Sequence, residues 1–361
     1  MFPPTPLPNT PTTTVTSPGR PVALITGGSR GIGRVLAQAL AGRGMAVGVV
    51  ARSGDELAET VELVRRAGGT GAAAPADVTD RDALAGALAE LRQRLGPVDL
   101  LVNNAGIVGP VGPLWLTDSQ DWWTTMDVNL RGLLLTTQLV VPEMVTRGRG
   151  RIINMTSQAG TYRWPLVSAY SVSKAAVVKL TENLAHEVGR HGVRVFSVHP
   201  GLLPIGMSED FAARPPVDGY EAHVRDWALR ELAEGRGAEP GQAVELILRL
   251  AAGDGDALSG RHLSVHDDLD VVLDRLAEVR AGDLYVMRPE RLTIRRSGLT
   301  PAYYRGRSAA MWQAASSRVD VPGMRIAVNA GAPAARERGR RDHIYPLQAP
   351  FAGAPVDGGA P

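Results

Sequence analysis

The run VALITGGSRGIG, from Val22 to Gly33, joins a strand pattern to a glycine-rich turn and then to a helix pattern. Its first five residues are apolar or β-branched, as in a buried strand. The residues that follow it, VLAQAL at 35–40, repeat apolar side chains at the spacing of a helix. A strand that passes through such a turn into a helix begins a βαβ unit, so the run predicts an α/β fold.

Strand and helix patterns alternate along the chain as far as about Val265. The predicted strands are Val22–Thr26, Ala46–Ala51, Ala72–Pro75, Leu100–Asn103, Arg151–Thr156, Arg194–His199 and His262–Val265. Helical spacing of apolar residues lies between them, for example at Leu84, Leu88 and Leu91. Such alternation indicates parallel strands connected by helices on both faces of a sheet. The predicted fold is a doubly wound, Rossmann-like α/β domain.

The predicted domain covers residues 21–290 and is flanked by two segments of different composition. Residues 1–20 are rich in Pro and Thr without an apolar period, which predicts a disordered arm. Near the end of the domain, Leu269–Arg280 has the pattern of one amphipathic helix, and Leu284–Met287 that of a short strand or extended segment. Residues 291–361 are rich in Arg, Gly, Ala and Pro and are predicted to form a mostly disordered extension.

The composition excludes several classes of protein. The chain has 361 residues, of which 44% are hydrophobic and 21% charged, as in a globular protein. It has no cysteine, which rules out a disulfide framework, a thiolate nucleophile and an iron–sulfur site. No apolar run is long enough to span a membrane and no secretory signal pattern is present, so a cytoplasmic location is expected. The net charge of +2 does not indicate a nucleic-acid binder, and the seven histidines form no metal-ligand cluster.

The glycine-rich turn has the features of a phosphate-binding loop. Gly27 permits a turn that a Cβ would resist, Gly31 lets a phosphate approach the backbone, and Gly33 lets the helix pack closely. The start of the helix offers unpaired N–H groups and a partial positive charge to a dinucleotide pyrophosphate. The other predicted cofactor contacts in this turn are Ser29, Arg30 and Ile32. A tight turn without a ligand would use the same glycines.

The end of the second predicted strand favours NADP(H) over NAD(H). An acidic residue there would hold the ribose 2′-hydroxyl of NAD, whereas an arginine suits a 2′-phosphate. The strand ends at Ala51, which is uncharged, and Arg52 follows it. Arg30 is expected on the same side of the pocket, and two guanidinium groups fit a phosphate dianion through charge-assisted hydrogen bonds. Arg52 could instead be a solvated loop residue.

Two further segments lie at strand ends, on the edge where such folds bind ligands. Asp77 and Val78 follow the third strand, and the Asp77 carboxylate could accept a hydrogen bond from the amino group of adenine. Small residues after the fourth strand would let the cofactor lie against the backbone. These residues are Asn103, Asn104, Ala105 and Gly106. Taken alone, each segment also suits a helix cap or an ordinary turn.

Ser157, Tyr170 and Lys174 are the central candidates for catalysis. Ser157 follows the fifth strand, while Tyr170 and Lys174 lie four residues apart on one helical face. Asn129 is expected in a long helix before them. A single Tyr-x-x-x-Lys pair is more often a surface pair, so the interpretation depends on Ser157 and on the glycine-rich turn upstream.

Together these segments resemble the short-chain dehydrogenase/reductase family in its compact single-domain form. The resemblance covers roughly residues 20–265 and rests on TGGSRGIG, ADV, NNAG, DVNLRG, INMTSQAG, YSVSK and HPG, which occur in the family's order and spacing. It implies an oxidoreductase that interconverts a carbonyl compound and an alcohol by hydride transfer with a nicotinamide cofactor. With the two arginines, the expected activity is that of an NADP(H)-dependent alcohol dehydrogenase or carbonyl reductase.

The resemblance also implies a role for each catalytic candidate. Tyr170 would be the general acid or base, and Ser157 would hydrogen-bond the substrate oxygen. Lys174 would contact the nicotinamide ribose and, through its positive charge, lower the pKa of the Tyr170 phenol. Asn129 would hold a water molecule that relays protons to Lys174.

The segment after His199 departs from the family pattern. Pro200 and Gly201 match it and are predicted to contact the cofactor. Ile205 stands where the family commonly has a threonine near the nicotinamide carboxamide, so one hydrogen bond, typically worth about 1 kcal/mol, would be lost. Residues 266–361 replace the family's usual short ending. In many relatives the terminal strand builds a tetramer interface, and a homo-oligomer, either a dimer or a tetramer, is expected here.

Aromatic residues are frequent in the segments expected to surround the substrate. A lid is expected at about residues 202–236, closing over the site. The aromatic residues of the lid and of the neighbouring loops are Phe211, Tyr220, Trp227, Trp115 and Trp164. They favour a hydrophobic or ring-bearing carbonyl compound or alcohol. Ordinary packing explains any one of them equally well.

A second hypothesis belongs to another class of protein. The chain could bind the dinucleotide as a sensor or scaffold, with little or no catalysis, and engage a partner through its C-terminal segment. Ile205 and the atypical ending motivate this hypothesis, whereas Asn129, Ser157, Tyr170 and Lys174 speak against it. NAD-linked oxidation is a third possibility, and only Arg30 and Arg52 distinguish it from the NADP(H)-linked reaction.

Overall fold

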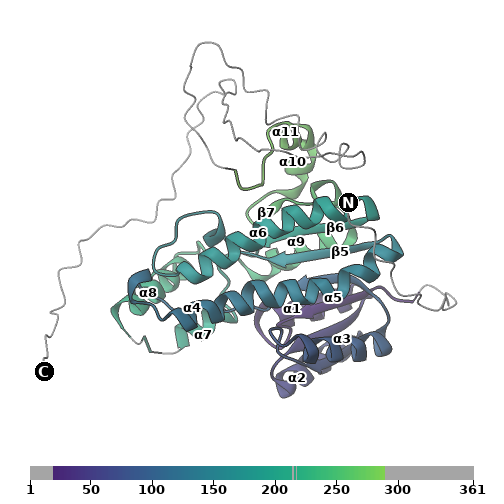
Figure 1. Cartoon of the computed structure of the whole chain (residues 1–361), viewed down its shortest axis with the longest axis horizontal. Helices are drawn as coiled ribbons and strands as arrows, with labels where there is room; N and C mark the ends of the chain where they lie inside the picture. Colours follow the sequence, from purple (N-terminus) through teal and green to yellow (C-terminus); the bar gives the residue numbers. More distant parts are fainter. Residues whose placement is uncertain (1–18, 214, 217, 289–361) are drawn as a thin grey trace, which may run out of the picture. The chain divides into compact units, whose positions relative to one another are not determined.

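A single parallel sheet forms the centre of the domain. The computed structural model describes residues 19–213, 215–216 and 218–288, so the predicted extension 291–361, and the predicted arm except for its last two residues, lie outside the described residues. Seven strands pair in parallel in the order β3-β2-β1-β4-β5-β6-β7. Figure 1 labels β5, β6 and β7 of this sheet. They are β1 (Val22–Thr26), β2 (Ala46–Ala51), β3 (Thr70–Pro75), β4 (Val98–Asn103), β5 (Gly150–Met155), β6 (Val193–His199) and β7 (His262–Ser264). The predicted doubly wound fold is confirmed.

Helices cover both faces of this sheet. They are α1 (Gly31–Gly42), α2 (Gly54–Arg66), α3 (Arg81–Leu95), α4 (Ser119–Met126), α5 (Gly132–Arg147), α6 (Ser168–Val188), α7 (Met207–Ala213), α8 (Gly219–Ala233), α9 (Pro240–Ala252), α10 (Leu269–Asp274) and α11 (Leu276–Ala281). One buried apolar cluster joins α1, α2 and α9 to the sheet and includes Leu40 and Ile247. A second joins α3, α5 and α6 to it and includes Leu84 and Met144. Within the described ranges, no helix is long and apolar enough to cross a membrane.

The strand order places the ends of β1 and β4 side by side. Strands β2 and β3 lie on one side of β1, and β4 to β7 lie on the other, so the order in which strands are added to the sheet reverses between β1 and β4. Thr26 pairs with Asn103 in the register between β1 and β4. Open parallel sheets bind ligands in the crevice beyond the carboxyl ends of the strands at such a reversal. The turns after Thr26 and Asn103 therefore meet where a ligand is expected.

The last part of the domain differs from its prediction. The single helix expected over Leu269–Arg280 is two short helices, α10 and α11, because the backbone leaves the helical conformation at Arg275. The strand considered for Leu284–Met287 does not form. Asp283 and Tyr285 have φ angles of 48° and 62°, and this left-handed conformation interrupts an extended run.

Candidate active site

The glycine-rich turn is compact because Gly27, Gly31 and Gly33 lack a side chain. Gly27 and Gly31 have φ angles of 64° and 53°, which side chains disfavour. A Cβ on Gly33 would lie 2.2 Å from the Gly27 carbonyl oxygen and 2.6 Å from Asn104 Nδ2. Gly33 thus lets the first turn of α1 pack against the loop that precedes it. The N–H groups at the start of α1 face this loop, as an anion site requires.

Thr26 and Asn104 hold this turn to the end of β4. Asn104 Nδ2 donates hydrogen bonds to the carbonyl oxygens of Thr26 and Gly27, at 3.1 and 3.0 Å. Thr26 Oγ1 accepts from the backbone N–H groups of Asn104 and Ala105, at 3.1 and 3.2 Å. The position of Asn104 after the fourth strand predicts a cofactor contact, whereas in the structure its side chain holds the turn, together with Thr26, for which the sequence predicts no role. The position of Thr26 directly before Gly27 is the signal that could have indicated this positioning role.

Several predicted cofactor contacts use their side chains elsewhere. Asn103 is buried and donates to Thr137 Oγ1 and Asn154 Oδ1, at 3.1 and 2.9 Å, so its side chain cross-links the sheet to α5. Ile32 packs into the apolar cluster beneath α1. For Asn103 and Ile32, the predicted cofactor contact would have to come from the backbone, and it stays a prediction. Asp77 Oδ1 accepts from Thr79 N and Oγ1, at 2.9 and 2.8 Å, as a turn residue would.

The two arginines predicted to share a phosphate differ in their surroundings. Arg30 forms an ion pair with Asp210 of α7, and both side chains are about half exposed. Arg52 is exposed and has no ion-pair partner in the described part of the chain. Ser29 Oγ donates to Glu56 Oε2 at 2.8 Å. The carboxylates of Asp210 and Glu56 were not anticipated, because they come from α7 and α2, far from the turn in sequence.

Ser157, Tyr170 and Lys174 come together at the end of β5. Ser157 follows β5 by two residues, and its Oγ accepts from Ala159 N at 3.2 Å, which caps a short 3₁₀ turn. Tyr170 in the first turn of α6 forms a side-chain hydrogen bond with Ser157. Lys174 Nζ donates to the Met155 carbonyl oxygen at 2.9 Å and lies 5.6 Å from the centre of the Tyr170 ring. The structure thus brings all three predicted side chains into one group.

Burial dominates the acid–base properties of this group. It raises the pKa of the Tyr170 phenol above its usual value, and the hydrogen bond with Ser157 opposes it only in part. Burial also lowers the pKa of Lys174 to about 8. The family resemblance implies that Lys174 lowers the pKa of the Tyr170 phenol. The net direction is upward instead, because burial penalises the phenolate more than its neighbours stabilise it. The neutral phenol is the form that can donate a proton.

Asn129 lies in a π-helical turn, η2 (Asp127–Arg131), between α4 and α5, rather than inside a long regular helix. Its Oδ1 accepts from Ile107 N at 2.8 Å, and its Nδ2 donates to the Ile107 carbonyl oxygen at 2.9 Å and to Ser173 Oγ at 3.0 Å. Ser173 Oγ in turn donates to the Tyr170 carbonyl oxygen at 2.7 Å. Asn129 therefore ties the loop after β4 to the helix that carries Tyr170.

Glycines leave space between these groups and the cofactor turn. A Cβ on Gly106 would lie 3.2 Å from Asn129 Oδ1 and 3.5 Å from Lys174 Nζ. Gly201, after β6, has a φ angle of 82°, and a Cβ there would lie 2.3 Å from Ala238 Cβ. Pro200 precedes it, directly after β6.

The side chain of Val78, another predicted cofactor contact, faces α5. It occupies the space that a Cβ on Gly132, the first residue of α5, would need.

Apolar side chains line the other side of Tyr170. Val167, Phe211 of α7 and Val224 of α8 form a buried cluster, and Trp164 and Tyr170 pack against it. The Trp164 ring meets the rings of Tyr170 and of Trp227 of α8 edge to face, with centroids 6.3 and 5.0 Å apart. The segment predicted as a lid thus supplies an aromatic wall beside the phenol. Trp115, also considered for this wall, is 83% exposed and does not belong to the cluster.

The lid also contacts the cofactor turn. A Cβ on Gly31 would lie 2.9 Å from Gly206 Cα, so the backbone before α7 rests on the first turn of α1. Ile205, at the position of the family's threonine, directly precedes this contact. No group of His, Asp and Glu residues in the described ranges could hold a metal ion. The glycine-rich turn, the Ser157–Tyr170–Lys174 group and the segment predicted as a lid together make up the candidate site.

Several known proteins have sequences similar to this chain. A family model described as short chain dehydrogenase matches residues 21–215. A gluconate 5-dehydrogenase of Gluconobacter oxydans is 32% identical over 70% of this chain and 95% of its own length. A 3-oxoacyl-[acyl-carrier-protein] reductase of Thermotoga maritima is 32% identical over 69% of this chain and 97% of its own.

Solved structures are similar to about two thirds of this chain. An actinorhodin polyketide ketoreductase with NADPH matches with a TM-score of 0.61 and 30% identity, over 68% of this chain and 95% of its own. An NAD⁺-bound xylitol dehydrogenase matches with a TM-score of 0.62 and 25% identity, over 68% and 97%. Both nicotinamide cofactors thus occur among similar structures, so likeness alone does not choose between them.

Proposed function

The chain belongs to the short chain dehydrogenase family and is an oxidoreductase, and from that premise we propose that it interconverts a carbonyl compound and an alcohol with NADP(H). The observation that carries this proposal is the group of Ser157, Tyr170 and Lys174 beside the glycine-rich turn. A sensor or scaffold would not need a buried lysine within 5.6 Å of a tyrosine ring centre, so this group favours catalysis over that hypothesis.

The residues of the candidate site fit a nicotinamide dinucleotide. Gly27, Gly31 and Gly33 place no side chain in the turn before α1 or at the first and third residues of α1, which suits the approach of a pyrophosphate. Exposed Arg52 is available to a 2′-phosphate, and it supports NADP(H) over NAD(H). When bound, the cofactor supplies or accepts the hydride. We propose Arg30 as a second phosphate ligand, which would exchange its ion pair with Asp210 for one with the phosphate.

In carbonyl reduction, Tyr170 donates its phenolic proton to the substrate oxygen as that oxygen gains negative charge. Burial keeps the phenol protonated before the reaction. Ser157 Oγ, which already bonds to Tyr170, donates a second hydrogen bond to the same oxygen. Lys174, below the ring, stabilises the phenolate that remains. In alcohol oxidation each transfer runs in the opposite direction.

The aromatic wall supports a hydrophobic substrate. The rings of Trp164 and Trp227 pack edge to face and form an apolar surface beside Tyr170. An apolar pocket with a few polar groups at the reacting atoms suits a ring-bearing ketone, aldehyde or alcohol. Because Trp227 belongs to α8, this wall is complete only when the lid is in place.

Replacing Arg52 by Ala is expected to weaken NADPH binding roughly tenfold, as loss of one charge-assisted contact would, and to leave NADH binding unchanged. Titration of tryptophan fluorescence with each cofactor measures both dissociation constants. Arg65→Ala, which removes another exposed arginine of the same region, serves as the matched control. Tighter NADH than NADPH binding in the unaltered chain would overturn the NADP(H) assignment and leave the family intact.

Carbonyl reduction is expected to slow above about pH 8. Lys174 has a pKa of about 8, so it is charged below that pH and loses its charge above it. The raised pKa of Tyr170 keeps the proton donor in place over the same range. The pH profile of kcat/KM, which reports groups of the free enzyme, checks this. A constant kcat/KM up to about pH 10, near the pKa of an ordinary phenol, would contradict the role given to Lys174.

A further inference from the structure

Strand β7 lies at the edge of the sheet, yet its outer side is occupied. Ser197 N of β6 donates to the Arg261 carbonyl oxygen at 3.2 Å, and Val265 N donates to the His199 carbonyl oxygen at 3.1 Å. Backbone groups point to alternate sides along a strand, so Arg261 and Val265 face β6. His262 and Ser264 consequently face away from the sheet. An outer row of this kind is a template on which another chain can pair.

The segment that follows β7 satisfies this outer row. His262 N donates to the Tyr285 carbonyl oxygen at 2.8 Å. Ser264 N donates to Asp267 Oδ2 at 2.7 Å, and Asp267 N donates to the Ser264 carbonyl oxygen at 3.0 Å. Three of the four outward backbone groups of His262 and Ser264 therefore have partners within residues 265–288.

Apolar packing fixes the same segment to the domain. Leu269 and Val272 of α10 and Val279 of α11 are buried in the cluster that also contains Leu263 of β7. The Tyr285 side chain packs against this cluster from outside. The left-handed backbone at Asp283 and Tyr285 turns the chain back toward β7. These contacts make the segment part of the folded domain.

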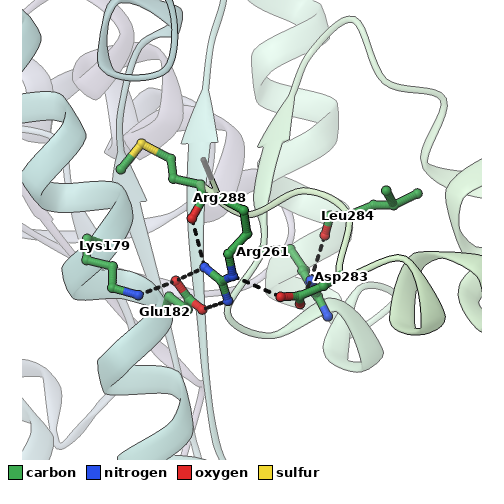
Figure 2. A network of polar contacts seen from close by, with 7 residues as sticks. Lys179, Glu182, Arg261, Asp283, Leu284 and Arg288 are labelled. Atoms are coloured by element: carbon green, nitrogen blue, oxygen red, sulfur yellow. Dashed lines mark hydrogen bonds and ion pairs between the residues drawn. The ribbon is translucent and has the colours of Figure 1, made fainter. Parts of the chain in front are cut away.

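Ion pairs connect the end of the segment to Arg261, directly before β7, and to α6 (Figure 2). Arg261 Nη1 donates to Asp283 Oδ1 at 2.9 Å and to the Leu284 carbonyl oxygen at 2.6 Å. Arg288 bonds to Asp283 Oδ2 at 3.0 Å and to both carboxylate oxygens of Glu182 in α6. Glu182 also pairs with Lys179, and these cations lower its pKa to about 2. The two arginines thus hold the turn that carries the Tyr285 carbonyl.

We propose that Val265–Arg288 is an edge cap, which closes β7 against pairing with a second copy of this chain. The occupant of the edge is the chain's own segment, and the partner it excludes is the β7 edge of another copy. The short length of β7 and the charged residues beside it are further features of protected edges. Any homo-oligomer, as expected from the family resemblance, would then form through other faces.

The double variant Arg261→Ala/Arg288→Ala tests the cap in the full chain. Hydrogen exchange, measured by mass spectrometry on peptides that contain residues 262–264, is expected to be roughly tenfold faster, because a network of several exposed pairs is lost. Peptides from β1 serve as the internal reference. Arg66→Ala breaks a comparable exposed pair with Glu62 on α2 and should leave residues 262–264 unchanged. Unchanged exchange in the double variant would overturn the proposal.

The second measurement is the mass of the particles in solution. Sedimentation velocity of the double variant is expected to show larger species whose fraction rises with protein concentration. Pairing of two β7 strands would slow exchange at residues 262–264 again at high concentration, which general aggregation would not do. Faster exchange without larger species would overturn the protective role. If the double variant does not fold, Glu182→Gln, which weakens the contact with Arg288 and the pair with Lys179 but leaves Arg261 and Asp283 in place, is measured in the same two ways.

Discussion

Tyr170→Phe is expected to lower turnover by roughly 10²- to 10⁴-fold, the range of a lost general acid, while NADPH binds as before. The substitution removes one oxygen atom and retains the ring that packs against Trp164. The phenylalanine has no proton to donate, whereas Ser157 Oγ, the hydrogen-bond partner of Tyr170, is retained to bind the substrate oxygen. Steady-state rates with a panel of ring-bearing ketones and aldehydes, beside fluorescence titration with NADPH, measure the two effects separately.

A matched control for this variant is Tyr162→Phe. Tyr162 lies on the loop after β5 and is 66% exposed, so loss of its hydroxyl should change neither turnover nor cofactor binding. Turnover of Tyr170→Phe within a few-fold of the unaltered chain would refute the assignment of Tyr170 as the proton donor. Loss of NADPH binding in the same variant would instead indicate that the phenol helps to hold the cofactor. A melting curve of each variant shows whether its fold is retained.

Local patterns in the sequence were sufficient to predict the sheet and the positions of its functional turns. A run such as VALIT can only be buried, and alternation with helical spacing then requires parallel strands with crossovers. Gly27 has the left-handed backbone that suits the turn predicted for it, and Gly31, predicted only to let a phosphate approach, has it as well. Tyr170 and Lys174 are four residues apart in one helix, so their proximity follows from the helical repeat alone.

Contacts between distant segments could not be predicted in this way. The partner of Arg30 is Asp210, which lies in the lid and has no local signal that relates it to the turn. Asn103 was assigned to the cofactor from its place at a strand end, but its side chain finds Asn154 and Thr137 in the core. The pKa of Tyr170 depends on how deeply the fold buries the phenol. The spacing of residues along α6 does not predict this burial.

Gly33→Ala is expected to weaken binding of NADPH and NADH alike by at least tenfold and to destabilise the fold. The new methyl group would lie 2.2 Å from the Gly27 carbonyl oxygen, a backbone atom held in place by Asn104. Either the turn or the start of α1 must shift, and such overpacking typically costs about 1–3 kcal/mol. The shift displaces the N–H groups that would bind the pyrophosphate, which both cofactors share. Fluorescence titration and thermal melting measure the two consequences.

The opposite result is expected nine residues further along the same helix. Gly42 also lies in α1, and a Cβ there would meet no atom within 4 Å. Gly42→Ala should therefore raise the stability by about 0.4–1 kcal/mol, through the entropy of the unfolded chain, and leave both cofactor affinities unchanged. Because the two substitutions are chemically identical, a difference between them isolates the close approach at Gly33 from a general effect of glycine in a helix. Equal cofactor affinities in the two variants would show that the turn at Gly27 does not hold the cofactor.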